Sequence, residues 1–374
     1  MGICDNKNIE TKNEEKIEIM PSNNIKMVFE NNKIIKIKEL SNKRFGILLN
    51  NSFKIYNLNN LKFLYQIKLP IIICNEYNND DKGILDFIEL KNYDLVFWSL
   101  KKIFFYKLSK DKYKLYQEIN KFEKEEKKII SDINFEESTI EFIINSIHEL
   151  TNGKLICCNS FGLIIYAKIN GKYVFESKDY MKIDVRKIIE INENKIILLQ
   201  RYHYYYWYCS FNNFSSHTYL ISIYDIKTKN ITKLAENKVT NKDYFGYILF
   251  SYLIKNGYLL IRYGNKIDIY DLNNNVALIN NDQETILDNK KIFGKNYKIL
   301  KEEMDIIFLC DYSDNLIITK NNKNKARIYM LKDNSLKYAK DFPYQLEGLK
   351  EIIKLTNNSY IMYSEYELIY LKNI

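Results

Sequence analysis

Three histidines and six cysteines are the groups in this chain that could ligate a metal or act as a base or nucleophile. His203, Cys209 and His217 form the densest set, but their spacing matches no zinc motif. His148 lies in the strand-like segment SIHEL, where we expect a hydrogen-bonded core or edge residue rather than a catalyst. The G-x-S-x-G, P-loop, H-E-x-x-H and paired-carboxylate motifs are all missing from the sequence. We therefore predict no catalytic residue, no metal site, no cofactor and no enzyme activity.

The aromatic segment 203–217 offers a different chemistry, recognition of a protein surface. Tyrosine and tryptophan supply large contact areas at low entropic cost and dominate binding hot spots. The alternative is that the segment prolongs two strands as a hairpin and packs on its neighbours. On the first interpretation the partner-binding residues are Tyr204, Tyr205, Tyr206, Trp207, Tyr208, Phe211 and Phe214.

The N-terminal sequence MGIC offers a third chemistry, lipid attachment. It partly matches the acylation pattern M-G-x-x-x-[ST], with Asn6 in place of the hydroxyl residue. Acyl chains on Gly2 and Cys4 would together anchor the protein firmly, because a single chain binds a membrane only marginally. An unmodified leader is the alternative. We expect a cytoplasmic protein that associates with a membrane only if its N-terminus is acylated.

A repeat must position these segments, and it returns seven times along the chain. Its clearest copies are residues 40–56, 90–106, 150–166 and 254–270. The first copy contains four short apolar stretches, at 34–40, 45–50, 53–58 and 63–69, separated by polar turns. Such spacing predicts a four-stranded antiparallel meander, and a repeat of about 45 to 60 residues is typical of propeller blades.

The last copy is one strand short, and an apolar run at 25–31 precedes the first copy without a blade of its own. Pairing of this run with the last blade would close the ring and remove exposed sheet edges. We therefore predict an all-β fold, a seven-bladed β-propeller of four-stranded antiparallel blades closed by an N-terminal strand. Residues 25–374 would form this single domain, and residues 1–24 a flexible charged leader. In the fifth copy we expect the fourth strand at 276–282.

Each blade ends its third strand on an apolar residue followed by tyrosine. These tyrosines are Tyr56, Tyr106, Tyr166, Tyr224, Tyr270, Tyr329 and Tyr370. The pairs Tyr224-Asp225 and Tyr270-Asp271 look like the Trp-Asp pair of the WD40 repeat with tyrosine substituted, although no blade has the Gly-His start. The chain thus resembles the WD40-like propeller families over nearly its whole length. The resemblance implies a rigid platform for other macromolecules.

Composition agrees with a strand-rich fold made inside a cell. Of the 374 residues, 46% are hydrophobic and 14% aromatic, with 32 Tyr, whereas 3 Pro and 11 Gly leave most turns to Asn and Asp. The excess of Asn, Lys, Ile and Tyr matches the codons of an AT-rich genome. The net charge of +9 is scattered through the chain, so we expect no nucleic acid partner. The cysteines show no disulfide or zinc spacing, which predicts buried free thiols in a reducing compartment.

Strand direction places the long connections on one face of the propeller. In a four-stranded meander, the loops between second and third strands share a face with the loops between blades. The long connections 71–83, 120–139, 203–217 and 283–304 all fall in these two classes, and loops of this length are often functional.

Three functions remain open. We favour a scaffold that binds a protein through the face with the long connections and the aromatic insertion. The alternative is an enzyme or small-ligand binder that uses the central channel. A third possibility, recruitment to a membrane or nucleic acid by positive charge, would weaken steeply with salt.

Overall fold

All of the structure described here is strand or turn. The computed structural model describes residues 16–19, 24–30, 32–70, 83–109, 112–120, 143–160, 162–181, 184–204, 216–239, 251–255, 258–263, 266–271, 297–298, 307–313, 316–320, 325–332 and 335–372. Across these ranges no helix is long and apolar enough to cross a membrane.

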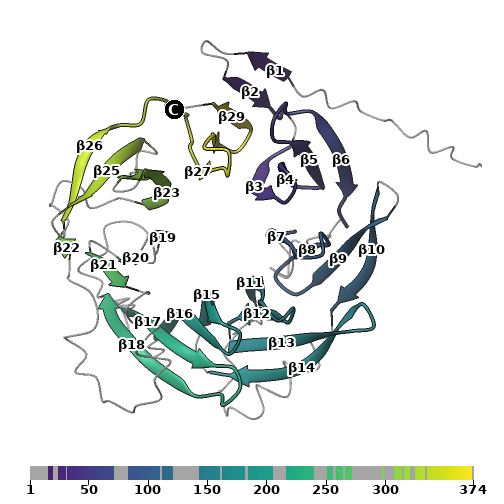
Figure 1. The fold of residues 1–374 in the computed structure, drawn as a ribbon, viewed down its shortest axis with the longest axis vertical. Helices are drawn as coiled ribbons and strands as arrows, with labels where there is room; N and C mark the ends of the chain where they lie inside the picture. The colour runs from purple at the N-terminus through teal and green to yellow at the C-terminus, as the bar shows by residue number, and fades with distance from the viewer. Residues whose placement is uncertain are drawn as a thin grey trace, which may run out of the picture.

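The strands form small antiparallel sheets arranged as a ring around a central opening (Figure 1). The first blade contains β3 (Ile34–Leu40), β4 (Arg44–Leu49), β5 (Ser52–Asn57) and β6 (Phe63–Lys68). The second contains β7 (Asp86–Glu89), β8 (Leu95–Trp98), β9 (Ile103–Ser109) and β10 (Lys112–Ile119). The third contains β11 (Ile144–Glu149), β12 (Leu155–Asn159), β13 (Gly162–Ile169) and β14 (Lys172–Tyr180).

Three more blades follow in the same order. The fourth contains β15 (Asp184–Asn192), β16 (Lys195–Tyr204), β17 (Ser216–Asp225) and β18 (Ile231–Val239). The fifth contains β19 (Ser251–Lys255), β20 (Tyr258–Tyr263), β21 (Lys266–Asp271) and β22 (Tyr297–Lys298). The sixth contains β23 (Ile307–Ser313), β24 (Leu316–Lys320), β25 (Ala326–Lys332) and β26 (Ser335–Asp341). In each blade the first strand lies nearest the opening (Figure 1).

The remaining sheet, called the closing sheet, combines both ends of the chain. It contains β27 (Glu351–Lys354), β28 (Tyr360–Tyr363), β29 (Glu367–Leu371), β2 (Ile25–Val28) and β1 (Lys16–Ile19). As the strand count predicted, β2 pairs with β29, and Ile25 lies opposite Tyr370. The number of four-stranded blades was wrong: six are present rather than seven, because β1 pairs with β2 and gives the closing sheet five strands. β1 comes from the predicted leader.

The fifth blade departs from its predicted strands. Its fourth strand in the structure is β22, whose residues 297 and 298 pair with the start of β21, instead of the expected segment 276–282. The prediction that 283–304 joins two blades was therefore wrong, because part of this range belongs to the fifth blade. The rest of it, and residues 276–282, lie outside the described residues.

Apolar side chains fill the space between neighbouring blades rather than the middle of the ring. One cluster joins the second and third blades through Trp98, Phe105 and Tyr173. Others join the closing sheet to the first and sixth blades, the first blade to the second, and the third to the fourth. Cys157 and Cys158 point to opposite faces of β12, as alternation predicts, and enter two different clusters. Both are free thiols, and burial raises the pKa of Cys158 to about 12, so these thiols are unreactive packing groups.

Several of the repeated tyrosines are buried next to a β-bulge in the pairing with the outer strand. Four of them are at most 5% exposed and lie opposite a half-exposed apolar residue of the fourth strand, next to a β-bulge. The pairs are Tyr56 with Phe63, Tyr106 with Leu115, Tyr166 with Phe175, and Tyr329 with Tyr338. Because a bulge bends and twists its strand, it curves the outer strand of these four blades.

Asparagine makes many of the tight turns, as the scarcity of Gly and Pro predicted. Its side-chain oxygen accepts a hydrogen bond from the backbone two residues ahead, which fixes the turn locally. This contact forms at Asn57, Asn60, Asn92, Asn152, Asn192 and Asn357.

A second contact repeats between blades. A glutamate near the end of the first strand accepts a hydrogen bond from a backbone N–H in the first turn of the preceding blade. The four contacts are Thr356 to Glu39, Ser41 to Glu89, Lys91 to Glu149, and Thr151 to Glu190. We call these contacts the glutamate staples. They tie the closing sheet and the first four blades together in one direction around the ring.

Candidate functional site

The propeller has two unlike faces, which we name by their connections. The turn face carries the connections from first to second and from third to fourth strands, such as 41–43, 193–194 and 170–171. The loop face carries the wider gaps, between β6 and β7, between β10 and β11, and between β16 and β17. The gap between β21 and β22 is an exception, because β21 ends at the turn face.

The β16–β17 hairpin extends beyond the loop face. Pairing of β15 with β16 begins at Asp184 and Arg201, whereas β16 continues to pair with β17 through Tyr204 and Ser216. Three residues of β16 thus extend past the start of β15, which corresponds to ~10 Å at the rise of an extended strand. This register agrees with the alternative in which the segment 203–217 begins by prolonging the two strands as a hairpin. The insertion between the two strands is carried at its end.

Of the predicted partner-binding residues, the structure places only Tyr204, in β16. Tyr205, Tyr206, Trp207, Tyr208, Phe211 and Phe214 lie outside the described residues. Gly2 and Cys4, the candidate acylation sites, also lie outside them.

The metal hypothesis gains no support from the described part of the chain. His203 and His217 lie opposite each other in the β16–β17 register, while Cys209 lies outside the described residues. Among the residues that the structure describes, no group of three or more His, Cys, Asp or Glu side chains could hold a metal ion.

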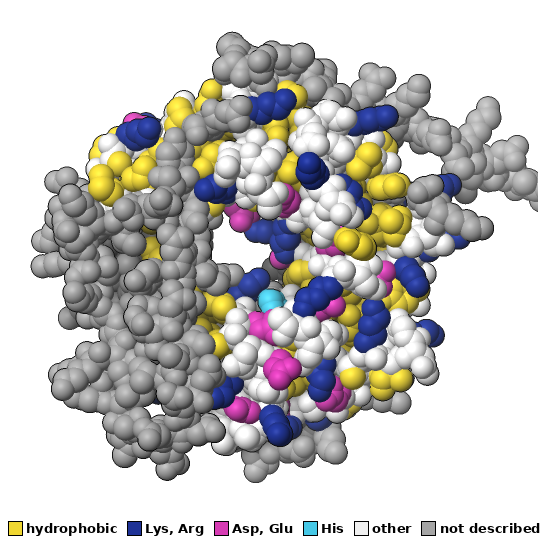
Figure 2. Space-filling model, viewed as in Figure 1, with side chains coloured by type: hydrophobic (Ala, Val, Ile, Leu, Met, Phe, Trp, Pro, Cys, Tyr) yellow, Lys and Arg dark blue, Asp and Glu magenta, His cyan; other side chains and the backbone are white. Residues whose placement is uncertain are grey.

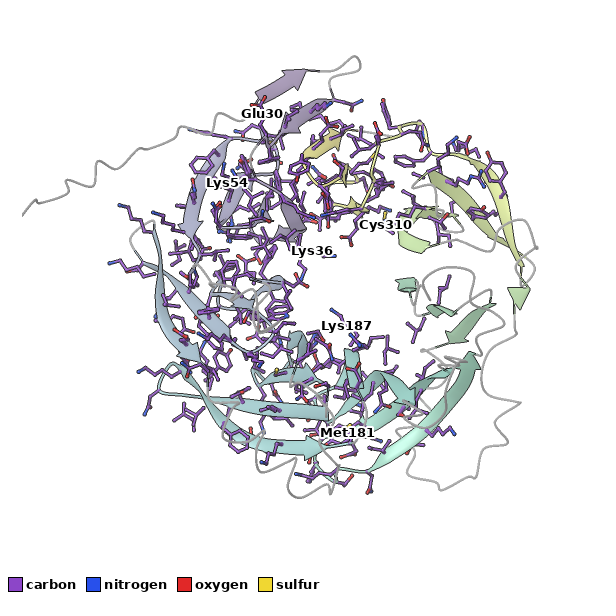
Figure 3. All side chains as sticks on the ribbon, turned by 180° about the vertical axis from the view of Figure 1, so that it is seen from behind. Glu30, Lys36, Lys54, Met181, Lys187 and Cys310 are labelled. Atoms are coloured by element: carbon purple, nitrogen blue, oxygen red, sulfur yellow. The ribbon has the colours of Figure 1, made fainter. Side chains whose placement is uncertain are left out.

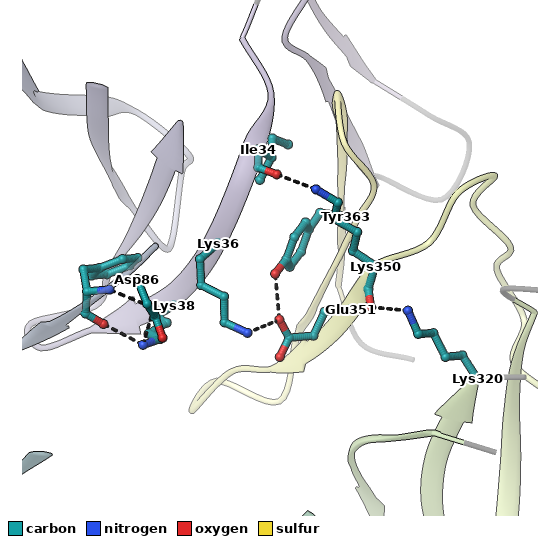
Figure 4. A network of polar contacts seen from close by, with 9 residues as sticks. Ile34, Lys36, Lys38, Asp86, Lys320, Lys350, Glu351 and Tyr363 are labelled. Atoms are coloured by element: carbon teal, nitrogen blue, oxygen red, sulfur yellow. Dashed lines mark hydrogen bonds and ion pairs between the residues drawn. The ribbon is translucent and has the colours of Figure 1, made fainter. Parts of the chain in front are cut away.

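Charged side chains gather around the central opening (Figure 2). One network joins the closing sheet to the first blade: the Lys36 ammonium lies 2.7 Å from Glu351, which also accepts a hydrogen bond of 2.6 Å from the Tyr363 hydroxyl (Figure 4). Burial and the neighbouring carboxylate raise the pKa of Tyr363, so its hydroxyl remains a donor. Next to it, the Lys320 ammonium donates to the carbonyls of Leu349 and Lys350.

A second network joins the first blade to the second. The Lys38 ammonium lies 2.6 Å from Asp86, donates to the Phe87 carbonyl, and stands 5.6 Å from the centroid of the Trp98 ring. Burial lowers the pKa of Lys38, and the Asp86 carboxylate opposes this effect. The Trp98 indole N–H is buried and has no hydrogen-bond partner among the described residues.

Lys187 forms no ion pair with a carboxylate within the described part of the chain. It belongs to β15 and lies at the inner edge of the ring, across the opening from Lys36 (Figure 3). Its charge acts on Lys38 and on His148. Burial is the largest cause of the lowered pKa of His148, and the Lys187 charge adds to it. Because its pKa is lowered, His148 is neutral at pH 7, although it lies 3.9 Å from Glu190.

Sequence reasoning missed this arrangement of lysines. The pattern of single strands does not pair these charges, because the partners Lys36 and Glu351 are 315 residues apart. The glutamate staples did leave a signal, a Glu directly before the last apolar residue of the first strand, as in KEL, IEL and HEL.

Comparison with known proteins gives the fold but no family. No protein-family model and no curated protein matches the chain. It is similar to the crystal structure of Saccharomyces cerevisiae Sqt1, with 12% sequence identity and a TM-score of 0.52, over 91% of this chain and 82% of that one. Together with the ring of antiparallel blades, this likeness supports a β-propeller fold.

Proposed function

We propose that this protein is a non-enzymatic interaction scaffold that binds a protein partner through its loop face. The observation that carries the proposal is the β16–β17 hairpin, which extends beyond that face and carries a segment with Tyr205, Tyr206, Trp207 and Tyr208. Rigid aromatic side chains on a firm support lose little entropy on binding and are typical of hot spots.

The construction of the ring supports this role. The glutamate staples and the apolar clusters hold neighbouring blades together, and the turn face has short connections apart from the one between β21 and β22. A rigid platform with variable loops on one side is how many binding folds separate stability from recognition. Propellers of the WD40 type are generally scaffolds, which agrees with a protein partner as the class of ligand.

The test is affinity purification of the full chain with residues 205–214 replaced by a short Gly-Ser linker. We expect the bound partner to be lost and the melting temperature to stay within a few degrees of wild type, because the linker leaves the paired strands intact. A matched control replaces residues 71–80, another connection on the loop face, and should retain the partner. Retention of the partner by the first variant, or its loss from both, would refute the role of the insertion.

A further inference from the structure

Four lysines from three different blades lie toward the loop-face half of the ring. Lys36 and Lys38 belong to β3, Lys187 to β15, and Lys320 to the loop-face end of β24. Since first strands begin at the loop face, Lys36, the third residue of β3, and Lys187, the fourth of β15, lie in that half. Lys38 is the fifth residue of β3, but its ammonium pairs with Asp86, the first residue of β7. Figure 3 shows Lys36 and Lys187 on facing sides of the opening.

The positive charges exceed the negative ones here. Asp86 forms an ion pair with Lys38 and Glu351 with Lys36, whereas Lys187 and Lys320 form no ion pair with the described side chains of this half. Nearby Arg186 and Asp184 compensate each other at 2.5 Å. His148 adds no charge, since its pKa is lowered. The described wall of the channel therefore carries a net positive charge.

These charges also act on one another at short range. Asp86 favours protonation of Lys38, whereas the charges of Lys187 and Lys36 oppose it. Glu351 likewise favours protonation of Lys320, whereas the charges of Lys350 and Lys36 oppose it. In both cases burial is the larger cause of the lowered pKa, so the ammonium groups have lost solvent as well as gained like-charged neighbours. Like charges held together in a partly dehydrated channel raise the local concentration of counter-ions.

We propose that the loop-face half of the central channel binds a small soluble polyphosphate anion, held by Lys36, Lys38, Lys187 and Lys320. Lysine is a common phosphate binder because its ammonium is a compact point charge with three donors. An anion with several phosphate groups fits donors that come from different sides of one opening. The site is separate from the hairpin of the proposed scaffold function and does not depend on it.

The test is calorimetric titration of the full chain with sodium tripolyphosphate. Lys187→Ala removes an ammonium without leaving a described carboxylate unpaired, so the ring should fold normally. Losing one charge-assisted contact should weaken binding roughly tenfold. Lys227→Ala is the matched control, because this exposed lysine lies in the β17–β18 turn of the same blade. We expect the control to bind like wild type, and Lys187→Arg to retain most of the affinity.

A melting temperature that rises with tripolyphosphate in wild type, and less in Lys187→Ala, would support the site, because a ligand specific for the folded state stabilises it. The proposal is overturned if titration shows no saturable binding, or if Lys187→Ala and Lys227→Ala bind equally. Binding only to vesicles with phosphorylated headgroups, and not to free tripolyphosphate, would also overturn it. None of these outcomes bears on the hairpin, which is tested by partner binding.

Discussion

Removal of the Glu89 carboxylate tests how firmly the blades are held together. Glu89 accepts hydrogen bonds from the Arg44 guanidinium and the Ser41 backbone, both at 2.5 Å, across the boundary of the first and second blades. The two charged side chains are 10% and 6% exposed. Removing one partner of a buried ion pair typically costs about 3 to 5 kcal/mol, because the other charge stays buried without compensation. We expect Glu89→Ala to destabilise the fold by about that amount.

The chain provides its own comparison for this variant. Glu39 occupies the same position one blade earlier, but among the described residues its carboxylate accepts hydrogen bonds only from the Thr356 N–H and hydroxyl, at 2.9 and 2.5 Å. Loss of these contacts, whose donors carry no charge, should cost about 1 to 2 kcal/mol in Glu39→Ala. Urea unfolding followed by tyrosine fluorescence gives both free energies, provided that the slope of unfolding free energy with urea is unchanged.

A double variant separates charge burial from packing. Replacement of both partners, Arg44→Met with Glu89→Leu, removes the charges together and should recover most of the stability lost in Glu89→Ala. If Glu89→Ala costs no more than Glu39→Ala, then Arg44 finds enough solvent without its partner, and the explanation by a buried charge is wrong.

Three other predictions concern separate parts of the molecule. The pKa of His148 is lowered in the folded protein, so as the pH falls below 6.5 the unfolded chain binds a proton before the folded one does. The free energy of unfolding should therefore decrease, by at most about 1.4 kcal/mol per pH unit, until the pH reaches the folded-state pKa. His148→Gln should remove this component from unfolding curves measured between pH 7 and 5. Gly162 has a φ of 141°, and an added Cβ would lie 2.1 Å from the Asp179 carbonyl oxygen, whereas Gly171 has a φ of 78° and open space around it. Gly171→Ala should cost roughly 1 kcal/mol of folding stability, and Gly162→Ala clearly more, as measured by thermal melting. Membrane fractionation of wild type against Gly2→Ala tests acylation, and an equal membrane fraction in both would rule out an anchor at Gly2.

Local pattern predicted most of the strands. Alternating apolar residues and Asn-rich turns are read within a few residues, and the strands of the first blade appear where the pattern places them. Ring closure was predictable because it follows from counting strands. β1 was not, since Lys16–Ile19 is a short charged segment that becomes a strand only when the edge of β2 is beside it.

The features that the sequence did not predict, β22 and the lysines around the channel, depend on long-range contacts. β22 pairs with the start of β21 after a long intervening segment, and no property of residues 297 and 298 alone specifies that register. The lysine-lined channel depends on residues brought together from blades far apart in the chain. Repeats multiply such ambiguity, because each blade offers similar strands to its neighbours.

Joining the two ends of the chain in one sheet constrains how the protein is made on the ribosome. Asn24 accepts a hydrogen bond from the backbone of Lys372, across 348 residues. At 5 to 20 residues per second, the strand at Ile25 emerges roughly 17 to 70 s before its partner. Throughout that time the nascent chain carries an unmatched strand at its leading end. Closure therefore comes after translation of the last blade, and a chain that terminates early keeps an open sheet edge available to other molecules.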